Sequence, residues 1–109
     1  MEDKQVASEK ADVEAALGRI DGERRFVVQN VGEAVAQDVH FTIEPVNGKN
    51  SPVVAGEHEK KFPVSKLEPG ESESLLAIIT PGTGLHFRAF VRWRDPDGSS
   101  IEKVFDLSV

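Results

Sequence analysis

The sequence predicts an all-β fold, a sandwich of seven antiparallel strands in one domain. Short apolar or alternating segments recur along the chain, and turn-forming pairs such as Asp21-Gly22 and Pro69-Gly70 separate them at intervals typical of a sandwich. At 109 residues, 39% of them apolar, the chain is long enough for one hydrophobic core. No apolar run approaches the roughly 18 residues that a membrane-spanning helix requires, so we expect no direct membrane insertion.

Charge is concentrated at the start of the chain. Residues 1–23 hold seven acidic and three basic side chains, which supply four of the six net negative charges. Residues 1–10 are polar and rich in charge, and we expect them to form a disordered or helical leader. The folded domain is then expected over residues 11–109. No signal-peptide core follows the first residues, and the cellular location is left unknown.

Residues 11–19 fit two structures. One face of a helix would hold Val13, Ala16, Leu17 and Ile20. One face of a strand would hold Val13, Ala15 and Leu17, so periodicity alone does not decide. The hairpin signal Asp21-Gly22 directly afterwards favours a strand.

Six further strands complete the prediction. Two of them have special features: Pro63 cannot donate to a ladder and marks a short edge strand, and the apolar run 75–79 predicts a central strand covered on both sides. Ala77 and the leucines of that run also fit a helix. The six segments are 24–30, 37–45, 60–64, 72–80, 85–95 and 99–109.

The last two strands can be placed in register. Pairing Trp93 with Ile101 also sets Arg92 opposite Glu102 and Phe90 opposite Val104, so both faces become chemically consistent. The same register pairs Ala89 with Phe105, Phe87 with Leu107 and Arg88 with Asp106, with residues 95–99 as the loop. A slip of one residue would place cations among the apolar side chains.

The segment from Phe26 to Ile43 is predicted to cross between the two sheets. The Asn30 side chain suits a turning backbone and Gly32 permits a positive φ, so the chain leaves one sheet at Asn30 and enters the other near Ala36. Pro69-Gly70 has the residues of a type II turn.

Three segments together resemble a known family. Residues 27–43 (VVQNVGEAVAQDVHFTI), 67–75 (LEPGESESL) and 90–99 (FVRWRDPDGS) resemble the immunoglobulin-like modules of the bacterial and archaeal CARDB and NEW3 type, over about residues 25–108. The late strand departs from that family by ending in Trp-Arg-Asp. The resemblance implies an immunoglobulin-like sandwich whose motifs specify a fold and no reaction. It also implies an appendage of a larger protein.

Catalytic and metal-binding residues are not apparent. The chain has no cysteine, which excludes disulfides and thiolate chemistry, and no serine lies in a nucleophile-elbow pattern. His40, His58 and His86 are far apart and lack ligand spacing, so we expect surface residues. We therefore expect no catalytic, cofactor-binding or metal-binding residue, and no enzyme activity.

A basic row, Arg88, Arg92 and Arg94, alternates with apolar residues on the sixth strand. By itself such a row suits nucleic acid. The register places Glu102 and Asp106 opposite two of its members, and the net charge of −6 opposes polyanion binding, so no nucleic-acid partner is expected. Trp93 alternates in phase with the core positions of its strand and is expected to be buried rather than a stacking platform.

Strand alternation places three turns at one end of the sandwich. They gather the carboxylates Glu33, Glu68, Glu71, Asp95 and Asp97. Residues 95–98 begin like a calcium loop but lack its later ligands, so a solvated acidic end is expected. The long polar loop 46–60 and residues 80–84 lie at the other end, where the binding loops of sandwiches cluster.

These observations lead to two hypotheses of function. The first is a non-catalytic interaction or spacer module, with a neighbouring domain or an unidentified protein as its partner. The second is an accessory domain that binds carbohydrate or a small molecule. Sugar recognition usually needs an exposed aromatic platform, and the chain has one tryptophan and no tyrosine.

Overall fold

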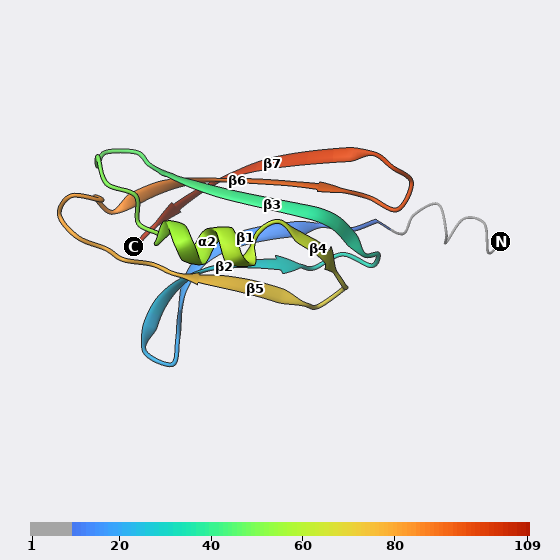
Figure 1. Ribbon diagram of the computed structural model, residues 1–109, viewed down its shortest axis with the longest axis horizontal. Coiled ribbons are helices and arrows are strands. Elements are labelled where there is room, and N and C mark those ends of the chain that lie inside the picture. The colour runs from blue at the N-terminus through green and yellow to red at the C-terminus, as the bar shows by residue number, and fades with distance from the viewer. Residues whose placement is uncertain (1–9) are drawn as a thin grey trace.

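The computed structural model describes residues 10–109 and forms a sandwich of two antiparallel sheets (Figure 1). The expected leader falls almost wholly on residues 1–9, which lie outside the described residues. Strand and helix bounds are β1 Val13–Ile20, β2 Glu23–Asn30, β3 Ala36–Pro45, α2 Ala55–Lys61, β4 Val64–Leu67, β5 Ser72–Leu76, β6 His86–Arg94 and β7 Ser100–Ser108.

The two sheets confirm the predicted all-β fold. One sheet has the strand order β1-β2-β5 and the other β4-β3-β6-β7, with every neighbouring pair antiparallel. The chain changes sheet between β2 and β3, between β4 and β5, and between β5 and β6. This is an immunoglobulin-like arrangement in which the fourth strand pairs with the third.

The core lies between the inner faces of the sheets. Alternate residues of each strand point inward, so β6 buries Phe87, Ala89, Val91 and Trp93 while the residues between them face outward. Phe26 of β2 meets Phe87 of β6 edge to face, with ring centroids 5.6 Å apart, so this aromatic pair joins the two sheets.

The prediction of a strand over residues 11–19 is confirmed from Val13 onward, because β1 covers Val13–Ile20 while residues 11 and 12 precede it. β1 pairs with β2 from Val13–Asn30 to Ile20–Glu23. The connecting Asp21 and Gly22 have φ of 53° and 84°, the two positive values of a type I′ hairpin turn.

The crossing between sheets depends on Asn30, which is fully buried. Its Oδ1 accepts hydrogen bonds from the backbone N–H groups of Gly32 (2.9 Å) and Asp12 (3.2 Å). Its Nδ2 donates to the carbonyl oxygens of Ala34 and Leu67, both at 2.8 Å. One side chain therefore satisfies four backbone groups where the chain leaves its ladder.

Gly32 has a different role from the predicted one. Its φ is not among the positive values, so a left-handed conformation is not the reason for glycine here. A Cβ at this position would lie 2.5 Å from the Asp12 nitrogen and 2.5 Å from the Lys10 oxygen. Glycine is required because the crossing segment passes directly against the backbone that leads into β1.

Two further local predictions are confirmed. Gly70 has φ 85° and the Glu71 N–H donates to the Glu68 carbonyl at 2.9 Å, as in a type II turn. The β6–β7 register is the predicted one in all six pairs, including Trp93 with Ile101.

The strand predicted over residues 60–64 is wrong in place. Residues 60 and 61 belong to α2, and β4 begins at Val64, after Pro63. The reason is the composition of residues 55–61, AGEHEKK, which is rich in helix formers up to the proline that ends the helix. The polar loop predicted over 46–60 accordingly contains most of this helix.

The fifth strand is an edge strand rather than a central one. It covers Ser72–Leu76 and pairs only with β2. Beyond β5 the chain contacts the loop that precedes α2, where the N–H of Ile78 donates to the Pro52 carbonyl at 2.7 Å. Ile78 is 39% exposed, so this apolar run is not covered on both sides along its whole length.

An ion pair links the sheets on the side where β1 faces β7. Lys103 lies on the inner face of β7 between the core-packed Ile101 and Phe105, and its Nζ is 2.5 Å from Asp12 Oδ1. An inward-pointing charge of this kind opposes pairing of an edge strand with another chain.

Candidate interaction site

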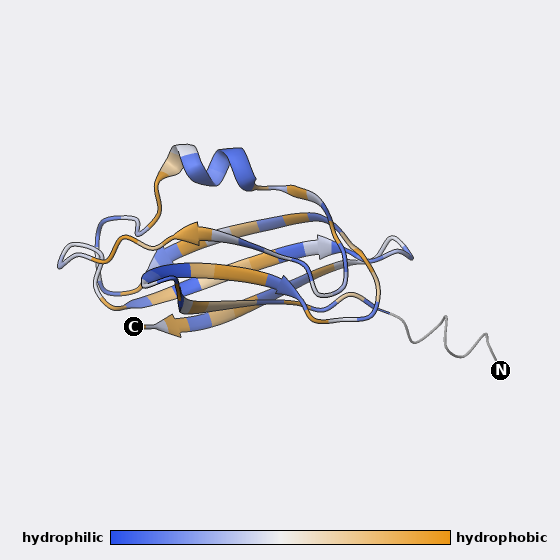
Figure 2. Cartoon of the chain, turned by 90° about the horizontal axis from the view of Figure 1, so that it is seen from below, coloured by the Kyte–Doolittle hydropathy of each residue, from blue (hydrophilic) through white to orange (hydrophobic). Residues whose placement is uncertain are grey.

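Helix α2 lies on the flank of the sandwich, between the edge strand β5 and the part of β3 that extends beyond its pairing with β4. The helix is almost entirely hydrophilic and sits outside both sheets (Figure 2), and none of its residues is buried. It therefore contributes little apolar area to the core. Its contribution comes from polar side chains that reach the backbones of both edges.

At the β5 edge, side chains occupy backbone groups that a further strand would otherwise pair. The Leu76 N–H donates to Glu57 Oε1 at 3.0 Å, and Lys61 Nζ donates to the Ser74 carbonyl at 2.8 Å. Lys61 also lies 3.9 Å from Glu57 and 3.7 Å from Glu73. These bonds close the β5 edge to strand addition.

At the β3 edge, α2 covers less. β4 pairs with β3 only as far as Val39, and beyond it His58 Nε2 hydrogen-bonds the Phe41 carbonyl. The His58 ring also stacks on Phe62, with centroids 5.8 Å apart. This contact holds the helix against the sheet and caps one edge carbonyl.

The next edge residue, Ile43, has no such cap. Val46 N–H donates to the His86 carbonyl across the β3–β6 ladder, and hydrogen bonding alternates along an antiparallel pair. The backbone N–H and C=O of Phe41 and Ile43 therefore point away from β6. Among residues 10–109, no side chain or loop hydrogen-bonds the N–H or C=O of Ile43.

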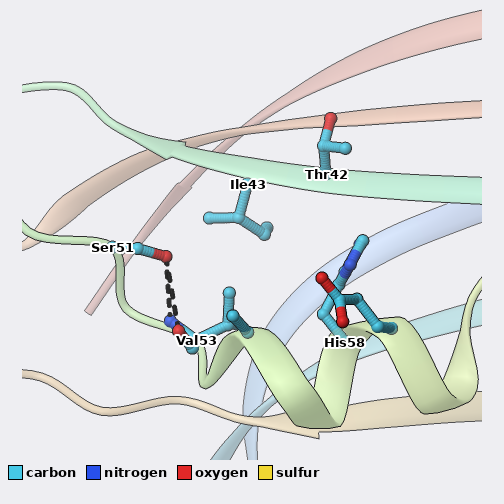
Figure 3. Close-up of a pocket in the computed structure, with 7 residues that line it drawn as sticks. Thr42, Ile43, Ser51, Val53 and His58 are labelled. Atoms are coloured by element: carbon cyan, nitrogen blue, oxygen red, sulfur yellow. Dashed lines mark hydrogen bonds between the residues drawn. The ribbon is translucent and has the colours of Figure 1, made fainter.

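An open groove of about 250 Å³ runs beside this uncapped edge. Ile43 and Val53 face one another across it, with Thr42 above and His58 at one side (Figure 3). Ser51 caps the backbone of Val53 on the far wall, its Oγ accepting from that N–H at 3.3 Å. The lining also includes Ala55 and Glu59.

A second surface is the outer face of the four-stranded sheet. Cross-strand pairing sets Thr42, Phe90 and Val104 in one row over β3, β6 and β7. Val104 is 54% exposed and Phe90 is half-buried. Charged rows flank this apolar row, His40–Arg92–Glu102 on one side and Glu44–Arg88–Asp106 on the other.

The arginines of this face are partly paired. Arg88 Nε lies 3.5 Å from Asp106 Oδ1, as the register predicts. Arg94 bonds Asp38 at 2.6 Å instead, since a bulge between Gln37 and His40 turns Asp38 toward it with φ 50°. Arg92 faces Glu102 across the ladder without an ion pair within 4.0 Å among the described residues.

The histidines do not converge on one point. His40 and His86 lie on the outer face, half-buried and exposed respectively, as expected. His58 differs from the expected surface residue because it is half-buried against Phe62 and Phe41. Within residues 10–109 no group of three or more His, Cys, Asp or Glu side chains could hold a metal ion.

The acidic end contains one carboxylate that is not solvated. Asp95 is 4% exposed, and its Oδ1 accepts from the Ala11 N–H at 3.1 Å and from Trp93 Nε1 at 3.3 Å. Asp97 is exposed, and the hydrogen bond that it accepts from the Ser99 N–H lowers the pKa of its carboxyl from the ordinary value. Glu71 accepts from the Glu68 N–H at 2.8 Å within its own turn.

Trp93 is buried, as predicted, at 2% exposure. It cannot serve as a surface platform for a sugar ring. The indole N–H finds its acceptor in Asp95, which explains how a polar ring nitrogen is accommodated in the core.

Sequence reasoning missed the α2 residues Glu57, His58 and Lys61. Their partners lie 13 to 19 residues away and are backbone groups, which carry no sequence signal. The available clue was composition, because Ala, Glu and Lys precede a proline. The sequence carries no signal that predicts the unpaired backbone groups of Ile43.

Comparison with known proteins assigns no relative. No family model, no curated protein and no solved structure matches the chain. Within residues 10–109, a helix with the length and hydropathy of a membrane span is not found.

Proposed function

We propose that this chain is a non-catalytic, immunoglobulin-like interaction module that binds a neighbouring domain or a partner protein. The observation that carries the proposal is the outer face of the four-stranded sheet. An apolar row centred on Val104 and Phe90 lies there between two rows of mixed charge. An apolar centre with a polar rim is the usual composition of a protein interface.

The remaining features agree with binding rather than catalysis. His40, His58 and His86 lie on separate elements. Asp95, the one buried carboxylate among residues 10–109, accepts hydrogen bonds from Ala11 and Trp93, which hold the fold together. The resemblance to CARDB and NEW3 modules supports the same role, since those modules are generally appendages of larger proteins.

Site-specific photo-cross-linking tests this function. Benzoylphenylalanine replaces Val104, and the protein is irradiated in its native cells. We expect a discrete adduct with another protein. The matched control replaces Glu14, an exposed residue of β1 in the other sheet, and gives no such adduct. Absence of an adduct at position 104 would leave only the role of a spacer.

A further inference from the structure

The two sheet edges beside α2 differ in the hydrogen bonding of their backbone groups, and this difference has no part in the proposed function. Glu57 and Lys61 occupy the β5 edge, whereas on the β3 edge the N–H and C=O of Ile43 have no bond within residues 10–109. An unpaired donor and acceptor on one edge residue match the backbone of an extended peptide. The β3 edge thus has the hydrogen-bonding pattern of a strand-addition site.

The groove gives this edge a means of selecting side chains. Strand addition gains affinity from main-chain bonds and specificity from neighbouring pockets. The lining of the groove includes the apolar residues Ile43, Val53 and Ala55 and the polar residues Ser51 and Glu59. A peptide with an apolar side chain beside a polar one fits this lining.

The charge of the groove selects the sign of that polar side chain. Glu59 is the only Asp, Glu, Lys or Arg in the lining, and Glu44 follows Ile43 directly on β3. Neither carboxylate has an ion pair within 4.0 Å among residues 10–109. A lysine or arginine is complementary to both.

We propose that the β3 edge at Ile43 binds an extended basic peptide segment of a partner protein. The segment pairs with the Ile43 backbone, places an apolar side chain against Val53 and Ala55, and sets a cationic one beside Glu59. This inference goes beyond the proposed function, which uses the outer face of the sheet. Only two backbone bonds and one ion pair form, so binding is weak, with a Kd of about 1 mM.

Nuclear magnetic resonance titration of the full chain tests the inference. The probe is a capped hexapeptide that alternates valine and lysine, and its counterpart alternates valine and glutamate. We expect the lysine peptide to shift the amide signals of Ile43, Ser51 and residues 53–55 and to slow hydrogen exchange at Ile43. The glutamate peptide binds about tenfold more weakly.

A charge reversal provides the matched control. Glu59→Lys is expected to reverse the preference between the two peptides, whereas Glu14→Lys, the same change on exposed β1, leaves the preference intact. A thermal melt of each variant confirms that it is folded. The inference is overturned if the lysine peptide shifts no signal near Ile43 at several millimolar, or if Glu59→Lys and Glu14→Lys behave alike.

Discussion

The indole nitrogen of Trp93 donates a hydrogen bond to Asp95 Oδ1 at 3.3 Å, two residues further along the chain. The same oxygen accepts the backbone N–H of Ala11, 84 residues away, at 3.1 Å. A single buried carboxylate therefore ties the end of β6 to the segment that leads into β1. The core and the acidic end are connected through this pair.

Trp93→Ala should lower the free energy of unfolding by about 3–5 kcal/mol, because it empties a large volume in a packed core and removes the indole donor. Trp93 is 2% exposed, so the surrounding side chains have little room to relax. Denaturant melts measure the change. A loss under about 1 kcal/mol would show that the ring contributes little to packing.

Two substitutions of Asp95 separate the effect of its hydrogen bonds on stability from the effect of its charge. Asp95→Ala leaves two buried N–H donors without an acceptor and should cost about 1–3 kcal/mol, whereas Asp95→Asn keeps an oxygen in place and should cost less than about 1 kcal/mol. Equal losses in the two variants would mean that the negative charge itself, rather than the acceptor oxygen, stabilises this corner. Chemical denaturation at neutral pH distinguishes these outcomes.

Lys103 is expected to prevent the β7 edge from pairing with a second copy of the chain. Lys103→Val would make the inner face of β7 continuously apolar from Ile101 to Leu107 and release the ion pair with Asp12. We expect concentration-dependent self-association in sedimentation velocity runs. Lys103→Arg keeps the charge and should stay monomeric. A monomeric Lys103→Val protein at high concentration would show that the edge is guarded in another way.

Calcium is expected not to bind at the acidic end. A hard cation takes about six to eight oxygen ligands at one point, whereas Asp95 is engaged with Trp93 and Ala11, and Glu71 with its own turn. Addition of calcium should leave the melting temperature unchanged. A rise that a chelator reverses, or calorimetric binding tighter than about 1 mM, would contradict this.

The predictable parts of the fold are those in which one local pattern constrains two faces. The β6–β7 register follows because a slip would place Arg88 and Arg92 among apolar residues. The turn at Gly70 follows because its φ requires glycine. The structure of residues 60–64 could not be predicted from the local pattern. A helix of seven residues depends for its stability on tertiary contacts, such as the bond between His58 and the Phe41 carbonyl.

The candidate sites show the same division. The flanking pairs of the outer face, such as Arg88 with Asp106, come from the register and were predictable. The open edge at Ile43 was not, because it depends on where β4 stops and on how far His58 reaches. Gly32 is similar, since its need for glycine comes from a backbone that approaches from residues 10–12.

The most direct test of the account compares amide hydrogen exchange at Leu76 and Ile43 in the free protein. Glu57 bonds the Leu76 N–H at 3.0 Å, so this amide should exchange slowly and become fast in Glu57→Ala. The Ile43 N–H lies on the uncapped edge and should exchange near its unprotected rate in both proteins. Slow exchange at Ile43, equal to that of Leu76, would show that its edge is already closed and would contradict the account.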